Sequence, residues 1–250
     1  MSRLLIIPAA GAGSRLGADV PKVLVRVAGM TMLDRLLELY RESVAHVVVV
    51  VNPVFEQLVL QSVREHSDAE RVSFAQQHDA TGMLDAILLG TPAAKRMNPS
   101  SVWITWCDQV AVEPRTIERL GERTSAPSHD AMVMPTVLQQ RPYIHLERDS
   151  TGRIVSVLQR REGDMMPEVG ESDMGLFALS AATYFDRLPA YAHAVAIGRA
   201  TGERNFLPFI PWLARTETVT TFPAENAMEA IGINTPQDLA LVEQYLSTRP

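Results

Sequence analysis

Residues 4–24 read LLIIPAAGAGSRLGADVPKVL, a run of apolar residues that leads directly into a glycine-rich loop. The apolar run, residues 4–7, predicts a buried strand. Three glycines follow it: Gly11, Gly13 and Gly17. Glycine lets the backbone bend sharply and approach a ligand closely, and Arg15 and Lys22 place positive charge in the same segment. The stretch therefore predicts a phosphate-binding loop at the end of the first strand.

Neither of the two common phosphate-binding motifs fits this loop. A dinucleotide fingerprint requires G-x-G-x-x-G, but Leu16 stands where the third glycine belongs. A P-loop requires G-x-x-x-x-G-K-[ST], and neither Gly11 nor Gly13 begins such a run. The loop therefore belongs to another class, and a nicotinamide-dependent dehydrogenase is disfavoured.

The composition limits the classes of protein to which the chain can belong. Its 250 residues are 46% hydrophobic and 21% charged, which is enough to bury a substantial core. No apolar run approaches the ~20 residues of a membrane span, and the first residues match neither a secretory signal nor a lipidation motif. The single cysteine, Cys107, fits a reducing cytoplasm. We therefore expect a cytoplasmic protein that binds no membrane.

The charge is distributed unevenly along the chain. A formal net charge of −6 argues against a nucleic-acid partner. The first 30 residues instead carry four basic residues against one acidic residue: Arg3, Arg15, Lys22 and Arg26 against Asp19. A small basic region on an acidic protein suits a compact phosphorylated ligand. No His or Cys residues have the spacing of a zinc site.

The first half of the chain alternates strand and helix patterns. Apolar, β-branched runs predict strands, and apolar residues at helical spacing predict helices between them. The strands are expected at 4–7, 46–51, 71–75 and 102–105, and the helices at 32–40, 53–66, 83–89 and 114–123. This order implies right-handed crossovers and a parallel sheet covered on both faces. Ligands of such sheets bind beyond the carboxyl ends of the strands, near a switch in strand order.

The second half has shorter turns and more strands. We expect strands at 131–137, 143–147, 154–158, 174–179, 219–222 and 231–233, and helices at 181–188, 205–214 and 235–246. Thr235 with Asp238 predicts an N-terminal capping box for the last helix, with Pro236 in its first turn. We expect an α/β fold, a Rossmann-like three-layer α/β/α arrangement around a mostly parallel mixed sheet. Residues 1–250 would form one domain, about 1–125 binding nucleotide and about 126–250 binding the acceptor.

The opening segment resembles the signature of sugar-phosphate nucleotidyltransferases. That signature is a strand, then A-A-G-x-G-[ST]-R-[LM], then P-K-x-L. In this chain it reads Ala9-Ala10-Gly11-Ala12-Gly13-Ser14-Arg15-Leu16, followed by Pro21-Lys22-Val23-Leu24. Within this family, of the nucleotide-diphospho-sugar transferase fold, the resemblance is strongest to the uridylyltransferase domain of N-acetylglucosamine-1-phosphate uridylyltransferases.

Further matches occur in order along the chain. Gln77 and Gly82 resemble the base-reading Q-x-x-x-x-G element, although Gln76 leaves the register open. "WITWCDQV" stands at the position of the family's strand-end Y-G-D, "GESDMGLF" resembles E-x-N-x-G-x-[FY], and "IGINTPQDL" is similar to G-V-N-[TD]-x-x-[DE]-L. The resemblance therefore covers nearly the whole chain.

The chemistry of nucleotidyl transfer explains these residue types. Two anionic phosphate esters must approach each other, so positioning and positive charge should supply most of the catalysis. By the resemblance, Arg15, Lys22 and Asp108 are catalytic, and Asp108 with Asn234 holds Mg²⁺. The predicted nucleotide-binding residues are Ala9, Ala10, Gly11, Ala12, Gly13, Ser14, Arg15, Lys22, Gln77, Gly82 and Asp108. Asp108 and Asn234 could instead serve only as capping or turn residues.

The acceptor side departs from the acetylglucosamine enzymes. The residues expected there by resemblance are Trp106, His145, Gln159, Asp173 and Asn234. Gln159 stands where those enzymes have Glu, Asp173 where they have Asn, and His145 near a glycine that contacts the sugar amide. Met83 replaces a threonine beside Gly82. Each exchange changes hydrogen-bonding capacity, so acetylglucosamine 1-phosphate is a doubtful acceptor.

These observations predict an enzyme, a Mg²⁺-dependent nucleotidyltransferase that joins a nucleoside triphosphate and a sugar 1-phosphate to give a nucleotide sugar and pyrophosphate. Two alternatives remain open. One is a cytidylyltransferase acting on a non-sugar phosphate of the phosphocholine type, and the other is a catalytically silent nucleotide-sensing protein of the same fold. A homo-oligomer is possible, and we expect no acyltransferase activity because hexapeptide repeats are lacking.

Overall fold

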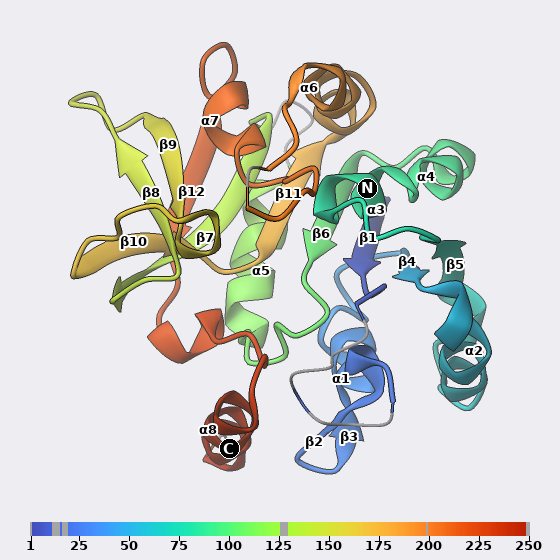
Figure 1. The fold of residues 1–250 in the computed structure, drawn as a ribbon. Helices are drawn as coiled ribbons and strands as arrows, with labels where there is room; N and C mark the ends of the chain where they lie inside the picture. The colour runs from blue at the N-terminus through green and yellow to red at the C-terminus, as the bar shows by residue number, and fades with distance from the viewer. Residues whose placement is uncertain (1, 12–15, 17–19, 126–129, 199, 249–250) are drawn as a thin grey trace.

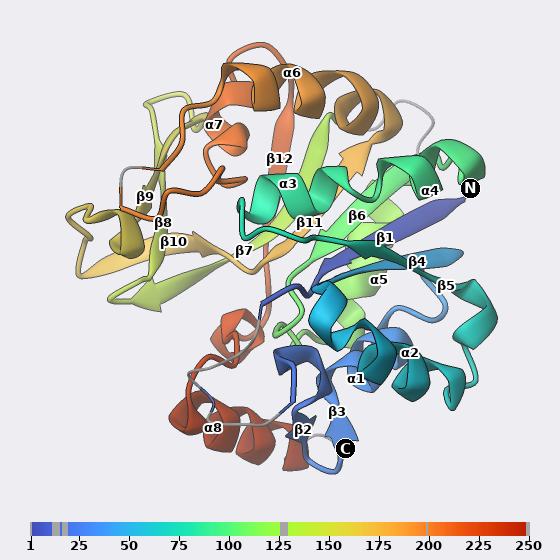
Figure 2. The same ribbon diagram turned by 45° about the vertical axis from the view of Figure 1, so that its right-hand side comes forward.

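A computed structural model describes residues 2–11, 16, 20–125, 130–198 and 200–248 (Figure 1). The predicted loop residues Ala12, Gly13, Ser14, Arg15 and Gly17 lie outside the described residues. The described residues form a mixed central sheet with helices on both faces, which confirms the predicted α/β class (Figures 1 and 2).

The central sheet draws strands from both halves of the chain. Its order is β10-β7-β11-β6-β1-β4-β5, with β12 paired to β7. The first half supplies β1 (Arg3–Pro8), β4 (His46–Val51), β5 (Val72–Gln76) and β6 (Ser101–Thr105). The second half supplies β7 (Met132–Gln140), β10 (Val169–Asp173), β11 (Leu176–Ser180) and β12 (Val219–Pro223). The four strands from the first half are parallel, while β10 and β11 run antiparallel to their neighbours. Strands from both halves thus share one sheet, and the division into domains stays a prediction.

Alternating residues of the strands face opposite layers of helices. In β1, Leu5 and Ile7 pack in one cluster and Leu4 and Ile6 in the other. The first cluster is covered by α1 (Met32–Leu39), α2 (Glu56–Arg64), α5 (Pro114–Arg123) and α8 (Pro236–Ser247). The second is covered by α3 (Met83–Leu88), α4 (Thr91–Met97), α6 (Leu188–Ala194) and α7 (Phe209–Leu213), as Figure 2 shows. Because β1 is buried on both faces, its sequence is continuously apolar.

The strand order reverses beside β1, and this positions the site. From β1 the chain builds outward to β4 and β5, and then crosses to the opposite side of β1 to form β6. The carboxyl ends of β1 and β6 therefore flank the switch point, where open α/β sheets bind their ligands. The segments that leave this edge begin with Ala9 and Trp106.

Smaller elements complete the fold. The hairpin of β8 (Ile144–Arg148) and β9 (Ile154–Gln159) forms a separate two-stranded sheet that packs against β10. A second small hairpin, β2 (Arg26–Val27) and β3 (Met30–Thr31), precedes α1. Short 3₁₀ turns cover residues 22–24, 53–55, 69–71, 160–162 and 227–230, and a π-helical turn covers 183–187. Among the described residues, no helix is long and apolar enough to cross a bilayer.

The structure differs from the sequence-based elements at several positions. Residues 231–233 form no strand, because the Ile233 amide donates to the Asp108 carbonyl oxygen at 3.3 Å instead of joining a ladder. The helix expected at 205–214 is shortened to α7, and the one expected at 181–188 extends to Ala194. Strand β10 and helix α4 were not predicted. The capping box of Thr235 and Asp238 at the start of α8 is confirmed.

Candidate active site

Three side chains from distant parts of the chain meet at the switch point. The Lys22 ammonium donates one hydrogen bond to the Asp108 carboxylate and another, of 2.8 Å, to Oδ1 of Asn234. Lys22 begins a 3₁₀ turn anchored by the buried side chain of Val23. Asp108 follows β6, and its side chain is 11% exposed. The structure thus brings together three of the predicted site residues.

Two local features orient these side chains. A Cβ atom on Gly232 would lie 3.1 Å from Oδ2 of Asp108, so the absence of a side chain at this position allows the chain to approach the carboxylate. The Asn234 side chain donates from Nδ2 to the Gly232 carbonyl oxygen at 3.2 Å, which leaves Oδ1 facing Lys22. The Asn234 amide donates to Oδ2 of Asp238 at 3.0 Å. Asp238, which forms the capping box of α8 with Thr235, therefore also holds Asn234 in place.

The oxygen atoms of Asp108 and Asn234 suit a hard divalent cation. The Asp108 carboxylate and Oδ1 of Asn234 both accept hydrogen bonds from the Lys22 ammonium, so a positive charge already lies between these two oxygen ligands. In the described part of the chain no group of three or more His, Cys, Asp and Glu side chains could hold a metal by itself. Mg²⁺ is commonly held by one or two protein oxygens together with substrate phosphates and water. The residues present therefore fit a magnesium ion that arrives with a phosphate ligand.

A small cavity of about 210 Å³ lies at the carboxyl ends of β1, β4 and β5. Its lining includes the predicted residues Ala10, Gly11, Gln77 and Gly82, together with Pro8, Asn52, Asp79, Ala80, Met83, Ala86 and Glu203. Ala9 is buried next to it, and its amide donates to the Val50 carbonyl oxygen at 2.8 Å. Of the predicted nucleotide-binding residues that are described, five therefore lie in or beside this cavity.

Gln77 and Gly82 are held together at this cavity. The Gln77 side chain donates from Nε2 to the Gly82 carbonyl oxygen at 3.1 Å. Gly82 has a φ of +118°, and a Cβ atom there would lie 2.4 Å from the Arg204 carbonyl oxygen. The neighbouring Gln76 is exposed and donates to Glu56 at 2.8 Å. Gln77, and not Gln76, is therefore the glutamine that lines the cavity.

A larger cleft of about 560 Å³ adjoins the first cavity and shares Met83 and Glu203 with it. Its lining includes five predicted residues: Trp106, Asp108, Gln159, Asp173 and Asn234. Gln159 accepts a hydrogen bond from the Asn205 side-chain amide, so its own amino group is left to donate. Asp173 accepts a hydrogen bond of 2.7 Å from the Gly175 amide, and burial raises its pKa to about 6.

His145 is the predicted acceptor residue that is not among those lining the cleft. Its Nδ1 lies 3.1 Å from the Glu171 carbonyl oxygen, and a Cβ atom on Gly170 would lie 2.5 Å from the same nitrogen. His145 therefore packs on the backbone of β10. Its role in acceptor binding stays a prediction.

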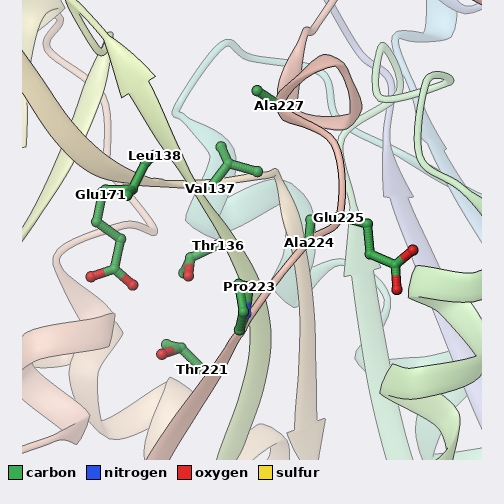
Figure 3. Close-up of a pocket in the computed structure, with 9 residues that line it drawn as sticks. All are labelled: Thr136, Val137, Leu138, Glu171, Thr221, Pro223, Ala224, Glu225 and Ala227. Carbon is green, nitrogen blue, oxygen red and sulfur yellow. The ribbon is translucent and has the colours of Figure 1, made fainter.

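A third cavity, of about 450 Å³, lies between β7, β10 and β12 (Figure 3). Figure 3 shows the oxygen atoms of Thr136, Glu171 and Thr221 on one side of it and the Glu225 carboxylate on the other. Glu171 is already paired, because both of its oxygens accept hydrogen bonds of 2.7 Å from Arg148. This cavity contains none of the predicted site residues.

Several cleft residues were missed by sequence reasoning. Gln109, Asn205, Arg161, Glu203 and Asp238 all line the cleft. Gln109 directly follows Asp108 and could have been found by that proximity. Arg161 and Glu203 form an ion pair of 2.7 Å between segments 42 positions apart, a contact with no local sequence signal.

Burial raises the pKa of Cys107 to about 12, so this thiol is a packed side chain and not a nucleophile.

Comparisons with known proteins show what the chain is similar to. The family model described as the MobA-like NTP transferase domain matches residues 5–205. The chain is 27% identical to the bifunctional protein GlmU of Pseudomonas syringae pv. syringae (strain B728a) and 28% identical to that of Azotobacter vinelandii (strain DJ / ATCC BAA-1303), over its whole length. It spans about half the length of these relatives, 52% and 53%. A similar fold occurs in HddC from Yersinia pseudotuberculosis complexed with GMP-PN, with a TM-score of 0.68, 18% identity, and coverage of 98% of this chain and 100% of the other.

Proposed function

The chain belongs to the MobA-like NTP transferase domain family, and from that premise we propose that it joins a nucleoside triphosphate to a sugar 1-phosphate. It is a nucleotidyltransferase. The proposed products are a nucleotide sugar and pyrophosphate. The substrates, the requirement for Mg²⁺ and the cytoplasmic location are part of this proposal.

One observation carries the proposal. Lys22, Asp108 and Asn234 meet at the switch point of the sheet, and the last two line the larger cleft, which adjoins the cavity of Gln77 and Gly82. A reaction between two phosphorylated ligands needs two neighbouring sites and positive charge near the reacting groups, because these groups repel each other. The two adjoining cavities and the Lys22 cluster support the proposal in this way.

The residues of the chain supply positioning and charge. The acceptor phosphate oxygen attacks the α-phosphorus in line, a new P–O bond forms, and the bond to the bridging α–β oxygen breaks. Its electron pair leaves with pyrophosphate, so no covalent intermediate with the protein is needed. Lys22 places a positive charge beside the reacting phosphates. Mg²⁺, held by Asp108 and Asn234, would supply further positive charge to the phosphate oxygens. Arg15, which lies outside the described residues, is proposed to bind the β- and γ-phosphates.

Gln77 and Gly82 are proposed to contact the base. The Gln77 side chain is largely buried, and its Nε2 atom is engaged by the Gly82 carbonyl oxygen. Its Oε1 atom is therefore the group available to accept a hydrogen bond from a base. A buried amide fixed in this way discriminates between donor and acceptor edges.

The test is a grid of nucleoside triphosphates against sugar and alcohol phosphates, with Mg²⁺-dependent release of pyrophosphate as the readout. Turnover with a sugar 1-phosphate supports the proposal. Turnover only with a non-sugar phosphate, such as phosphocholine, favours the cytidylyltransferase alternative. Tight nucleotide binding with no turnover anywhere in the grid favours the nucleotide-sensing alternative.

A further inference from the structure

The carboxylate of Asp173 is buried in the wall of the large cleft, and none of the described residues gives it a cationic partner. Asp173 is 7% exposed. It belongs to none of the ion pairs formed by the described residues, and no charged side chain among them contributes to its pKa. Its known partners are backbone amides, including that of Gly175 at 2.7 Å. A buried carboxylate is normally paired with a positive charge, since burial without one is costly.

The local turn does not explain the charge. The Gly175 amide requires an oxygen acceptor two residues earlier, and the side-chain carbonyl of asparagine would accept the same hydrogen bond. Asparagine is neutral, so it would make the turn without burying a charge. The negative charge of Asp173 therefore calls for a partner that enters the cleft.

The residue that binds the Asp173 carboxylate, Gly175, also contacts an aromatic ring of the same cleft. Gly175 has a φ of +64°, and a Cβ atom there would lie 2.2 Å from Cδ1 of Trp106. The Gly175 carbonyl oxygen accepts a hydrogen bond of 2.9 Å from the Trp106 amide. Gly175 thus binds Asp173 through its N–H group and Trp106 through its carbonyl group, while its Cα packs on the indole. Both side chains line the cleft.

The Trp106 ring is fixed by further aromatic packing. Its centroid lies 5.3 Å from that of Phe177 and 5.9 Å from that of Phe206. A carboxylate next to a fixed indole is a good environment for an organic cation, because the face of the ring attracts positive charge. A neutral hydroxyl group would gain neither the full attraction to the carboxylate nor the full attraction to the face of the indole ring.

We propose that the acceptor of this nucleotidyltransferase carries an ammonium group, which Asp173 binds as its counter-ion against the indole of Trp106. The inference rests on the proposed function and names the class of its acceptor: a phosphate ester that also bears an amine. An amino-sugar 1-phosphate and an amino-alcohol phosphate share this chemistry. The amino group of Gln159, left free to donate, would bind a hydroxyl oxygen of the sugar form.

The experiment compares acceptors that differ in one group. Glucosamine 1-phosphate is paired with glucose 1-phosphate, and phosphoethanolamine with 2-hydroxyethyl phosphate. For each acceptor, kcat/KM is measured by pyrophosphate release, and binding is measured by calorimetry with a non-hydrolysable triphosphate analogue present. We expect the wild type to prefer the amine by at least about 30-fold in one pair, the scale of a buried charge pair. The pair that shows the preference identifies the source of the amine.

The decisive variant is Asp173→Asn, which keeps the acceptor for the Gly175 amide and removes only the charge. We expect the preference for the amine to fall below about 3-fold, through a rise in KM for the amine acceptor that exceeds any change in KM for the hydroxyl acceptor. Asp186→Asn removes an exposed carboxylate outside the cleft and should leave the preference intact. Equal use of both members of each pair by the wild type, or equal loss for both in Asp173→Asn, would overturn the inference.

The two readouts separate this inference from the proposed function. If no acceptor releases pyrophosphate but the amine still binds more tightly than its hydroxyl counterpart, the proposed function fails and the ammonium subsite stands. If glucose 1-phosphate turns over well and the amine gives no advantage, the proposed function stands and the ammonium subsite fails.

Discussion

The Lys22 ammonium donates a hydrogen bond of 2.8 Å to Oδ1 of Asn234, a residue 212 positions further along the chain. The same ammonium contacts Asp108. If Asp108 and Asn234 hold the proposed Mg²⁺, the Lys22 ammonium must yield this position to the metal ion.

Substituting Lys22→Met should tighten the binding of Mn²⁺ to the nucleotide-free protein by about 5-fold, since a competing ion pair of ~1 kcal/mol is removed. Turnover should fall by at least about 100-fold, because a charge that acts on the reacting phosphates is lost. Electron paramagnetic resonance of free Mn²⁺ measures the first effect and pyrophosphate release the second. Lys95→Met, at an exposed position of α4, is the control. Unchanged Mn²⁺ affinity in Lys22→Met would show that Lys22 does not compete with the metal ion for Asp108 and Asn234.

Asp108→Asn should abolish most of the turnover while the fold persists. The amide is isosteric with the carboxylate, but it carries no charge for Lys22 or for a metal ion. We expect a loss of at least about 100-fold in kcat. Circular dichroism checks the fold, and Asp186→Asn serves as the charge control. Turnover within a few-fold of the wild type would remove Asp108 from the catalytic centre.

Asp173→Asn should make the protein more stable at neutral pH. The folded-state pKa of Asp173, about 6, exceeds the ordinary value of 3.8, so the folded protein binds the proton more tightly than the unfolded chain does. Ionisation in the folded protein therefore lowers the free energy of unfolding as the pH rises from about 4 to above 6, by about 1–3 kcal/mol.

Urea unfolding of the two proteins between pH 4 and pH 8 measures this difference. The gain in stability of Asp173→Asn should be greatest above pH 6 and should vanish near pH 4. Other titratable groups of the cleft, among them Asp108, Glu203 and Asp238, are the same in both proteins, so the difference isolates residue 173. A gain that is independent of pH would contradict the assignment.

Gly82→Ala should destabilise the protein and weaken nucleotide binding. Its φ of +118° and ψ of 173° lie in a region that is essentially restricted to glycine, which costs an alanine about 1–3 kcal/mol, and the Cβ atom would also clash with the Arg204 carbonyl oxygen at 2.4 Å. Gly152→Ala is a matched control, because its φ is +84° and no atom lies within 4 Å of the added Cβ. Urea unfolding should show a larger loss for Gly82→Ala than for the control. Equal losses in the two variants would mean that the chain near Arg204 moves away freely.

The first half of the fold could be predicted because its signals are local. The run of valines in β4 is apolar at every position because the strand is covered on both faces, and α1 shows its buried face through Leu33, Leu36 and Leu37. In the second half, the capping box of Thr235 and Asp238 could be predicted for the same reason. Each of these features depends on residues that are close together in the sequence.

The acceptor side could be predicted only in part, because its contacts are non-local. Strand β10 has the polar sequence VGESD, and it is a strand because β7 supplies its partners. Residues 231–233 have a strand-like sequence but are held by the loop after β6. Resemblance singled out Gln159 and Asp173, which line the cleft, yet the Arg161–Glu203 pair depends on two loops meeting in space.

The capping box of α8 also links the thermal stability of the helix to the orientation of Asn234, a proposed ligand of Mg²⁺. Asp238 accepts hydrogen bonds from the amides of both Thr235 and Asn234, so the first turn of the helix and the orientation of Asn234 depend on one carboxylate. Fraying of this turn would release Asn234 while the central sheet stays intact. Inactivation on warming should therefore precede the loss of ellipticity, and a nucleotide with its metal ion should narrow the interval between the two.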